Sequence, residues 1–589
     1  MTITKITSGQ ILSGFGVVSG GVLEVLSGGV ALFAVVSAGG MEVVSSGGRS
    51  FRSLVNASGT LAVSSGGTTQ GTINSGGTET IMAGGTAIGS LLEGTNAIQN
   101  DSGTVINTKV DSSADLNIGN NGTAIDVGLA YAGTENVFSG GVALATTVGN
   151  QADENIYKGG SASGTTVILG GTETVYASGF ASFATLSAGG TQAISSGGVA
   201  LNTFVNSGGG EFVYSGGAAV ESIVASGGYL VVLPGGVASN AFIEPGGNVV
   251  STGALLSQTT GGFTSHTTSL DFAVISGSRT AVYVLPKGNT ISTTVENSAN
   301  EYVFSGGVAS SSILGSGGHQ TLFAATATHT SVTYDGHEYV YQGGKSVSPT
   351  LNQGTEFVYS GSTVGAVLSG ATENVFSGGT ASGTVVNSSS FLNVSGGKTF
   401  GTVIHAYGRE SVYSGGTASG TIISAGTENV YAASLDLAPV ISGGTDYIYS
   451  AATVVGAVVV GAGTLNVSAG GIVQGGIVIS AATAVISGTM GAGQLVTFEG
   501  TGGQLTLYNL PAFAAQIAGY GANDKLNLET FAYGNGPTVL FTEAANNTSG
   551  VLKLTTPGAS EQLVLLGSYV TADFKIGTEN GGGTVVKFV

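Results

Sequence analysis

The chain has 589 residues, of which 104 are glycine and only 8 are proline; 42% are hydrophobic and 8% are charged. This length exceeds one ordinary core, the hydrophobic content excludes a disordered chain, and glycine that does not recur at every third residue excludes collagen. The formal net charge of −19 argues against binding to nucleic-acid phosphates, and the lack of cysteine excludes disulfides and thiolate metal sites. The abundance of Gly, Ser, Thr, Val and Ala is typical of short β-strands separated by tight turns.

The first uncharged segment, VLSGGVALFAVVSAGGM at residues 25–41, has the apolar character of a signal peptide or a membrane span. Glycine pairs, however, begin at Gly20 and Gly39, and again at Gly28 and Gly47, and both spacings are 19 residues. The same rhythm runs through the rest of the chain. We therefore interpret this segment as repeat and expect no classical N-terminal signal peptide.

The repeat is anchored by an acidic residue two positions before Val or Ile, followed by an aromatic residue. It reads ENVF at 135–138, ENIY at 154–157 and ETVY at 173–176, so that successive glutamates are 19 residues apart. Between anchors lies a second β-type element such as GTVVN at 383–387. Further anchors begin at Glu211, Glu301, Glu338, Glu356, Glu373, Glu410, Glu428 and Asp446.

A period of this length with two or three β-segments predicts one architecture. Each copy is a coil of a parallel β-solenoid, because a single coil cannot bury its apolar side chains and stacked coils can. Glycine suits the corners, where the backbone adopts positive φ. We predict an all-β fold: an elongated parallel β-solenoid (β-helix) of ~19-residue coils with a small β-rich C-terminal cap module. A helical reading fails because no 3.6-residue period is visible.

Strand alternation predicts which side chains face the core. In ENVF the Glu and the Val share one face, and the Asn and the Phe share the other. Only Val or Ile occupies the third position, so we place Val137, Ile156, Val175, Val375, Val412 and Val430 inward, with the glutamates near a corner and half solvated. The final aromatics then form an external ladder and a candidate contact surface: Tyr157, Tyr176, Tyr214, Tyr341, Tyr359, Tyr413, Tyr431 and Tyr449. The alternative, in which these aromatics fill the core, stays open.

Composition divides the chain into four regions. Residues 1–262 and 341–502 are regular solenoid repeats, whereas residues 263–340 contain two stretches without SGG corners, 263–298 and 319–337, and are expected to be irregular coils or an insertion. Residues 503–589 have longer strands and few such corners. This last segment is expected to cover the open end of the solenoid and to carry a secretion signal.

The pattern SGGTASGTVVN, with its TENV anchor, resembles the strand-loop-strand stalk repeats of AIDA-type autotransporter adhesin passengers. The likeness covers most of residues 8–490. It implies an extracellular β-helical rod that acts in adhesion, self-association or biofilm formation, with O-glycosylation on Ser or Thr. We expect no C-terminal membrane barrel of the kind that this family carries, since only residues 503–589 are free of the repeat. That tail resembles those of proteins exported by a C-terminal signal.

The sequence offers little support for catalysis or for a cofactor. His319, His329 and His337 lie close in sequence but lack the helical spacing or the cysteines of a zinc site, so no metal site is predicted. Asp524 is interpreted as a turn cap rather than an ion ligand. Glutamates repeated at every coil suggest a structural role, whereas a glycosidase needs one pair of acids in a groove.

We therefore predict a non-enzymatic bacterial surface or secreted rod that acts in adhesion, self-association or biofilm formation. Its partners would be other copies of itself or a cell-surface glycan or protein, and not nucleic acid. Two alternatives remain: a self-assembling filament or surface-layer subunit, and a carbohydrate-active β-helix enzyme. Such an enzyme would have to draw its non-repeated acids from residues 263–340.

Overall fold

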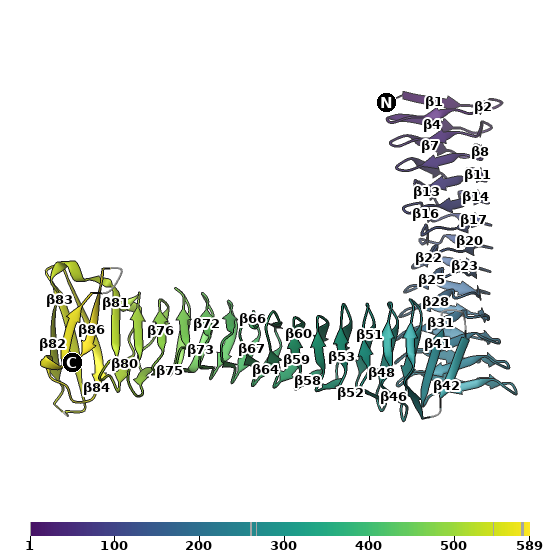
Figure 1. The fold of residues 1–589 in the computed structure, drawn as a ribbon. Helices are drawn as coiled ribbons and strands as arrows, with labels where there is room; N and C mark the ends of the chain where they lie inside the picture. The colour runs from purple at the N-terminus through teal and green to yellow at the C-terminus, as the bar shows by residue number, and fades with distance from the viewer. Residues whose placement is uncertain (1, 259–261, 267, 546, 579–581) are drawn as a thin grey trace. The chain divides into compact units, whose positions relative to one another are not determined.

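The structure is a computed structural model that describes residues 2–258, 262–266, 268–545, 547–578 and 582–589 (Figure 1). Parts of the N-terminal, irregular and C-terminal regions, at residues 1, 259–261, 267, 546 and 579–581, lie outside the described residues. The chain forms two compact units. The first comprises Met1–Thr268 with Arg279–Ala281, and the second comprises Ser269–Ser278 with Val282–Val589.

The first unit is a three-sided parallel solenoid, which confirms the predicted fold class. Its three sheets contain 14, 13 and 13 strands, and each strand pairs with the strand three places later. Glu135 therefore lies opposite Glu154, and Val137 lies opposite Ile156, in register one coil apart. One coil and the next consist of β22 (Thr134–Val137), β23 (Val142–Leu144), β24 (Thr147–Val148), β25 (Asp153–Ile156), β26 (Ser161–Ser163) and β27 (Thr166–Val167).

The core of each coil is narrow and is filled by alternate residues of the strands. The predicted inward set is confirmed: Val137, Ile156, Val175, Val375, Val412 and Val430 are all fully buried. The second strand contributes small side chains such as Ala143 and Ala162, which are also buried. Small residues on this side allow the three walls to approach closely while the Val column supplies most of the apolar surface.

The two glycines of each SGG corner have different roles. Gly159 has φ +75°, a backbone conformation that glycine adopts without steric cost. Gly160 has no such φ, but a Cβ built there would lie 2.3 Å from the carbonyl oxygen of Val137 in the coil below. In other corners Ser178 or Asn121 takes the positive φ, and glycine still follows. At Gly160 the close approach of the preceding coil therefore favours glycine, whereas alanine follows the positive φ in other corners, as at Ala114 and Ala152.

The second unit is also a parallel solenoid, and its larger sheet contains 28 strands. Its coils begin with β43 (Ser269–Asp271), which pairs in parallel with β46 (Asn289–Ile291). Parallel pairing continues to β79 (Gln504–Leu507) and β81 (Lys525–Ala532). Residues 269–340, part of which lacks SGG corners, thus follow the same coil pattern as their neighbours.

The first unit ends in an antiparallel hairpin. It consists of β41 (Ala254–Gln258) and β42 (Gly262–His266). The ring of Phe263 lies 5.7 Å from that of Phe212 and 5.4 Å from that of Tyr229, measured between centroids. These rings pack against each other on the outer side of the last coils of this unit.

The pairing changes from parallel to antiparallel near the C-terminus of the second unit. The antiparallel strands are β82 (Thr538–Glu543), β83 (Ser549–Thr556), β84 (Ala559–Leu566), β85 (Phe574–Gly577) and β86 (Gly583–Phe588). Before them, Asp524 accepts backbone hydrogen bonds from Gly503 at 2.8 Å and Gly521 at 2.9 Å, which is the turn-capping role expected of it. In the described residues no helix has the length and apolarity to cross a membrane.

Candidate functional site

Aromatic rings stack in columns where the anchor strands leave the core. In the first unit Phe138, Tyr157 and Tyr176 stack with centroid distances of 5.1 and 4.8 Å. In the second unit the spacing along two further runs is 4.7–5.4 Å. These runs are Phe304, Phe323, Tyr341, Tyr359 and Phe376, followed by Tyr413, Tyr431 and Tyr449.

Parallel register explains these columns, because equivalent residues of adjacent coils lie about 4.8 Å apart. The rings are partly in water: the exposed fractions of Tyr341, Tyr413 and Tyr449 are 38%, 40% and 36%. Tyr214 occupies the equivalent position of its own coil and is half-buried. The tyrosines that the sequence placed outside the core therefore do lie outside it, while their role in binding stays a prediction.

The sequence analysis did not predict one broader aromatic surface in the second unit. Tyr339 stacks on Phe357 at 5.1 Å, and Phe357 lies 6.3 Å from Tyr359 in the neighbouring column. We call Tyr339, Tyr341, Phe357, Tyr359 and Phe376 the aromatic patch. Its sequence signal is the replacement of the usual Asn by Tyr or Phe in EYVY and EFVY. In the first unit the same position instead carries a ladder of asparagine amides, including Asn136 to Asn117 at 3.0 Å.

The expectation of half-solvated glutamates is wrong. Glu135, Glu154 and Glu373 are fully buried, because strand alternation points them to the same side as the Val column. The third strand of the coil supplies a hydroxyl partner eleven residues later. Thr146 donates to Glu135 at 2.8 Å, and Thr384 donates to Glu373 at 3.0 Å.

Burial changes the ionisation of these acids. It raises the pKa of Glu135 to about 7 and that of Glu338 to about 8, because a carboxylate is costly to remove from water. The pKa of Glu154 is raised well above its usual value by burial and then by the charge of Glu135. Burial therefore favours the protonated form of these stacked carboxyls.

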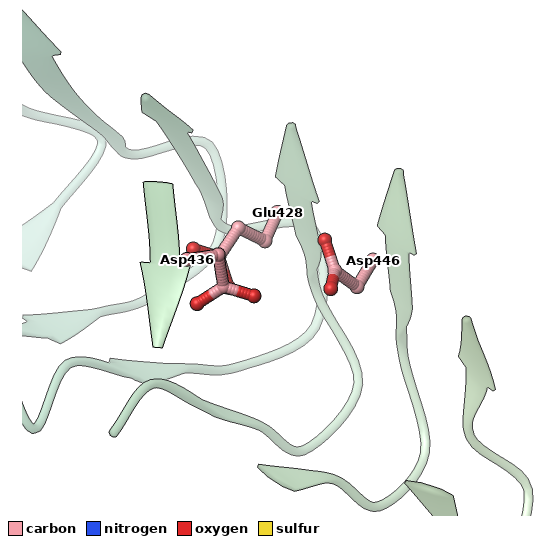
Figure 2. A group of neighbouring side chains, drawn as sticks. All are labelled: Glu428, Asp436 and Asp446. Atoms are coloured by element: carbon pink, nitrogen blue, oxygen red, sulfur yellow. The ribbon is translucent and has the colours of Figure 1, made fainter. Parts of the chain in front are cut away.

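The histidines separate into two places. His319 and His337 face each other in register with ring centroids 5.3 Å apart, whereas His329 lies at a corner with φ +55°. Burial and then the neighbouring His337 lower the pKa of His319. Among the described residues, three side chains with metal-ligand chemistry converge at Glu428, Asp436 and Asp446 instead (Figure 2).

Two hollows on the surface could in principle hold a sugar, and a glycosidase would need two carboxylates in the lining of such a hollow. One in the first unit, of about 630 Å³, has no carboxylate in its lining, which includes Phe33, Phe51 and Arg52. Another in the second unit, of about 410 Å³, includes the single carboxylate Glu529. Neither presents the pair of acids that glycoside hydrolysis requires.

Comparison with solved structures finds seven similar chains, two of which are described below. No protein-family model and no curated protein matches the chain. The chain is similar to a crystal structure of the TibC-catalyzed hyper-glycosylated TibA55-350 fragment, with 34% identity over 42% of this chain and 91% of that chain, at a TM-score of 0.42. It also aligns with the gp54 tailspike of Acinetobacter baumannii bacteriophage AP22 in complex with capsular saccharide, with 8% identity over 81% of this chain and 89% of that chain, at a TM-score of 0.18.

The parallel solenoid is the fold that the resemblance to AIDA-type autotransporter adhesin passengers implies. The fold and the repeat define a β-solenoid repeat protein.

Proposed function

We propose that this chain is a non-enzymatic, extracellular adhesive protein whose solenoid surface makes many weak contacts with its partner. The observation that carries this proposal is the repeated stacking of partly exposed aromatic rings, such as Tyr413, Tyr431 and Tyr449 at 5.0 Å spacing. Each ring offers a broad apolar face beside a hydroxyl that stays in water. Repetition at every coil allows small contacts to add by multivalency.

The partner that we propose is a cell-surface glycan or another copy of this chain. A sugar ring has apolar faces that fit against flat aromatic rings, and the surrounding Ser and Thr side chains supply hydrogen bonds. A second copy would present the same columns at the same spacing. The scarcity of Lys and Arg, 14 in 589 residues, argues against nucleic acid as the partner, since phosphate binding needs clustered basic side chains.

The placement of the acids supports a non-enzymatic role. Glu135, Glu154 and Glu373 repeat along the core and are sealed from any polymer that lies on the outside. Thr146 and Thr384 donate to Glu135 and Glu373 from inside the core, which is a structural placement. A hydrolase would instead display non-repeated acids in an open groove.

We also propose O-glycosylation at the exposed corners. Ser139 and Ser377 are exposed first residues of SGG corners, and such residues recur along the coils. The TibA fragment to which the chain is similar is hyper-glycosylated by TibC. Intact-mass measurement of protein from its native host, compared with protein made in a host without glycosyltransferases, tests this proposal, and equal masses would contradict it.

The test of adhesion uses cells that display the protein. Replacing Tyr413, Tyr431 and Tyr449 together by Ser should leave the fold intact and reduce cell clumping or adherence several-fold, because one column of contacts is removed. Phe400 and Ile422, which are also exposed but lie outside the columns, provide the control when both are changed to Ser. The control should behave like the wild type.

Two versions of this experiment distinguish another copy of the chain from a cell-surface glycan as the partner. Clumping between displaying cells alone indicates self-association, whereas adherence to target cells that is lost after enzymatic removal of their surface glycans indicates glycan binding. If the tyrosine variant clumps and adheres like the wild type while still folded, the columns are not the contact surface. If the wild type shows neither activity and degrades a polysaccharide, the enzyme alternative replaces this proposal.

A further inference from the structure

The interior of the solenoid follows a local rule in which a hydroxyl faces each buried acid. Thr146, Thr384 and Thr421 each lie eleven residues after an anchor glutamate and donate to it. In these coils the residue eight positions after the glutamate is alanine, for example Ala418 after Glu410. Glu410 is well satisfied, since Thr399 also donates to it at 2.6 Å.

The coil that begins at Glu428 breaks this rule twice. Position eleven is the buried Pro439, which has no hydroxyl to donate. Position eight is Asp436, which lies in register between Ala418 and Val454. A donor has been lost and a third acid has been added at the same level of the core.

The acids of this coil converge with the acid of the next coil. Glu428 and Asp446 are opposite each other on β69 (Thr427–Val430) and β72 (Thr445–Ile448), and Asp436 comes from β70 (Leu435–Leu437). Figure 2 shows Glu428 and Asp446 projecting from their strands beside Asp436. One carboxylate oxygen from each residue lies within 4.8 Å of those from the other two.

In the part of the chain that the structure describes, the carboxylate oxygens of these three side chains make no hydrogen bond of ordinary geometry, and their polar neighbours are one another and Thr421. Both carboxylate oxygens of Glu428, Asp436 and Asp446 are buried and unpaired, and all three residues are 0% exposed. An unpaired buried carboxylate costs several kcal/mol or more, so something must neutralise the group. The column of buried acids ends at Asp446, because the residue opposite it in the following coil is Leu465.

We propose that Glu428, Asp436 and Asp446 bind one divalent cation inside the solenoid, and that Ca²⁺ is the ion they fit best. The donor set consists only of carboxylate oxygens, which suit hard cations rather than the softer metals that prefer His or Cys. Ca²⁺ accepts irregular shells of oxygen ligands, whereas Mg²⁺ demands near-octahedral geometry and usually keeps several waters, so a sealed site made only of carboxylates suits Ca²⁺ better.

The position of the site determines how it would be loaded. The three carboxylates are sealed within the core, so the ion enters as the chain folds and is released slowly afterwards. The ion would join β69, β70 and β72, which belong to two successive coils, into one unit. This role does not depend on the adhesive function proposed for the outer surface.

The experiment uses the full chain, unfolded and then refolded at neutral pH with CaCl₂, with MgCl₂ or with EDTA, followed by dialysis and elemental analysis. We expect about one retained Ca²⁺ per chain for the wild type. Asp436→Ala restores the residue of the preceding coil and should retain none. Glu410→Gln changes a buried acid that has its own hydroxyl partners, and should retain the ion like the wild type.

A second readout does not depend on how the variants fold. Amide hydrogen exchange of β69 and β72 in the wild type should be at least tenfold slower after refolding with CaCl₂ than after refolding with EDTA. Retention of Ca²⁺ by Asp436→Ala at the wild-type level would overturn the proposal. So would a wild type that retains none and exchanges equally with and without Ca²⁺, because the carboxyls would then be neutralised by protons alone.

Discussion

Glu211 provides a clean test of the buried acids, because its neighbours in register are Gln192 and Leu230 rather than other carboxyls. Burial raises the pKa of Glu211 from 4.5 to about 7. The perturbation that we suggest is Glu211→Gln, which keeps the shape and removes the titration. Gln192 already occupies this position one coil earlier, so the substitution introduces no new side chain to the core.

The magnitude follows from linkage between protonation and folding. The folded form of Glu211 binds its proton more tightly than the unfolded form, so its contribution is fully present below about pH 4.5 and is lost as pH rises towards 7. A shift from 4.5 to about 7 corresponds to about 3 kcal/mol, at about 1.4 kcal/mol per pK unit. Glutamine does not titrate, so the variant should keep its stability over this range.

The assay is native-state hydrogen exchange of β34 (Gly210–Val213), because coils of a solenoid open locally and a single global transition is not assured. The opening free energy of the wild type should fall by about 3 kcal/mol more than that of Glu211→Gln between pH 4.5 and 8. Glu221→Gln, at an exposed corner of the same coil, is the control and should follow the wild type. Parallel profiles for the wild type and Glu211→Gln would show that this carboxyl is ionised in the folded protein.

Three further predictions concern the coil itself. Gly159→Ala should lower the free energy of unfolding by about 1–2 kcal/mol, because Gly159 has a positive φ. Gly160→Ala should lower it further, because the backbone of the coil below must move to make room for the added Cβ. A urea unfolding experiment that ranks the two variants in the opposite order would contradict this prediction. Val375→Asp buries a charge that nothing pairs and should open its coil to limited proteolysis, and an unchanged digestion pattern would refute the inward assignment. Deletion of residues 503–589, proposed as cap and export segment, should cause aggregation and loss from the culture medium, so a truncated chain that is soluble and secreted would rule out both roles.

Much of the architecture could be predicted from the sequence because a solenoid is determined by local repetition. The 19-residue spacing of Glu135, Glu154 and Glu173 identified the coil, and the restriction of the third anchor position to Val or Ile identified the inward face. The outward tyrosines followed from strand alternation alone. These features depend on one coil and its neighbour, and the sequence displays both.

Only the tertiary structure decided how side chains from different strands of a coil meet. Solvation of the anchor glutamates could not be judged from one strand, because their hydroxyl partners lie eleven residues away on another wall of the core. The same holds for Tyr339 and Phe357, whose stacking needs the register of two coils. Asp436 gave no signal in the sequence, since its meeting with Glu428 and Asp446 depends on how tightly the three walls close around a narrow core.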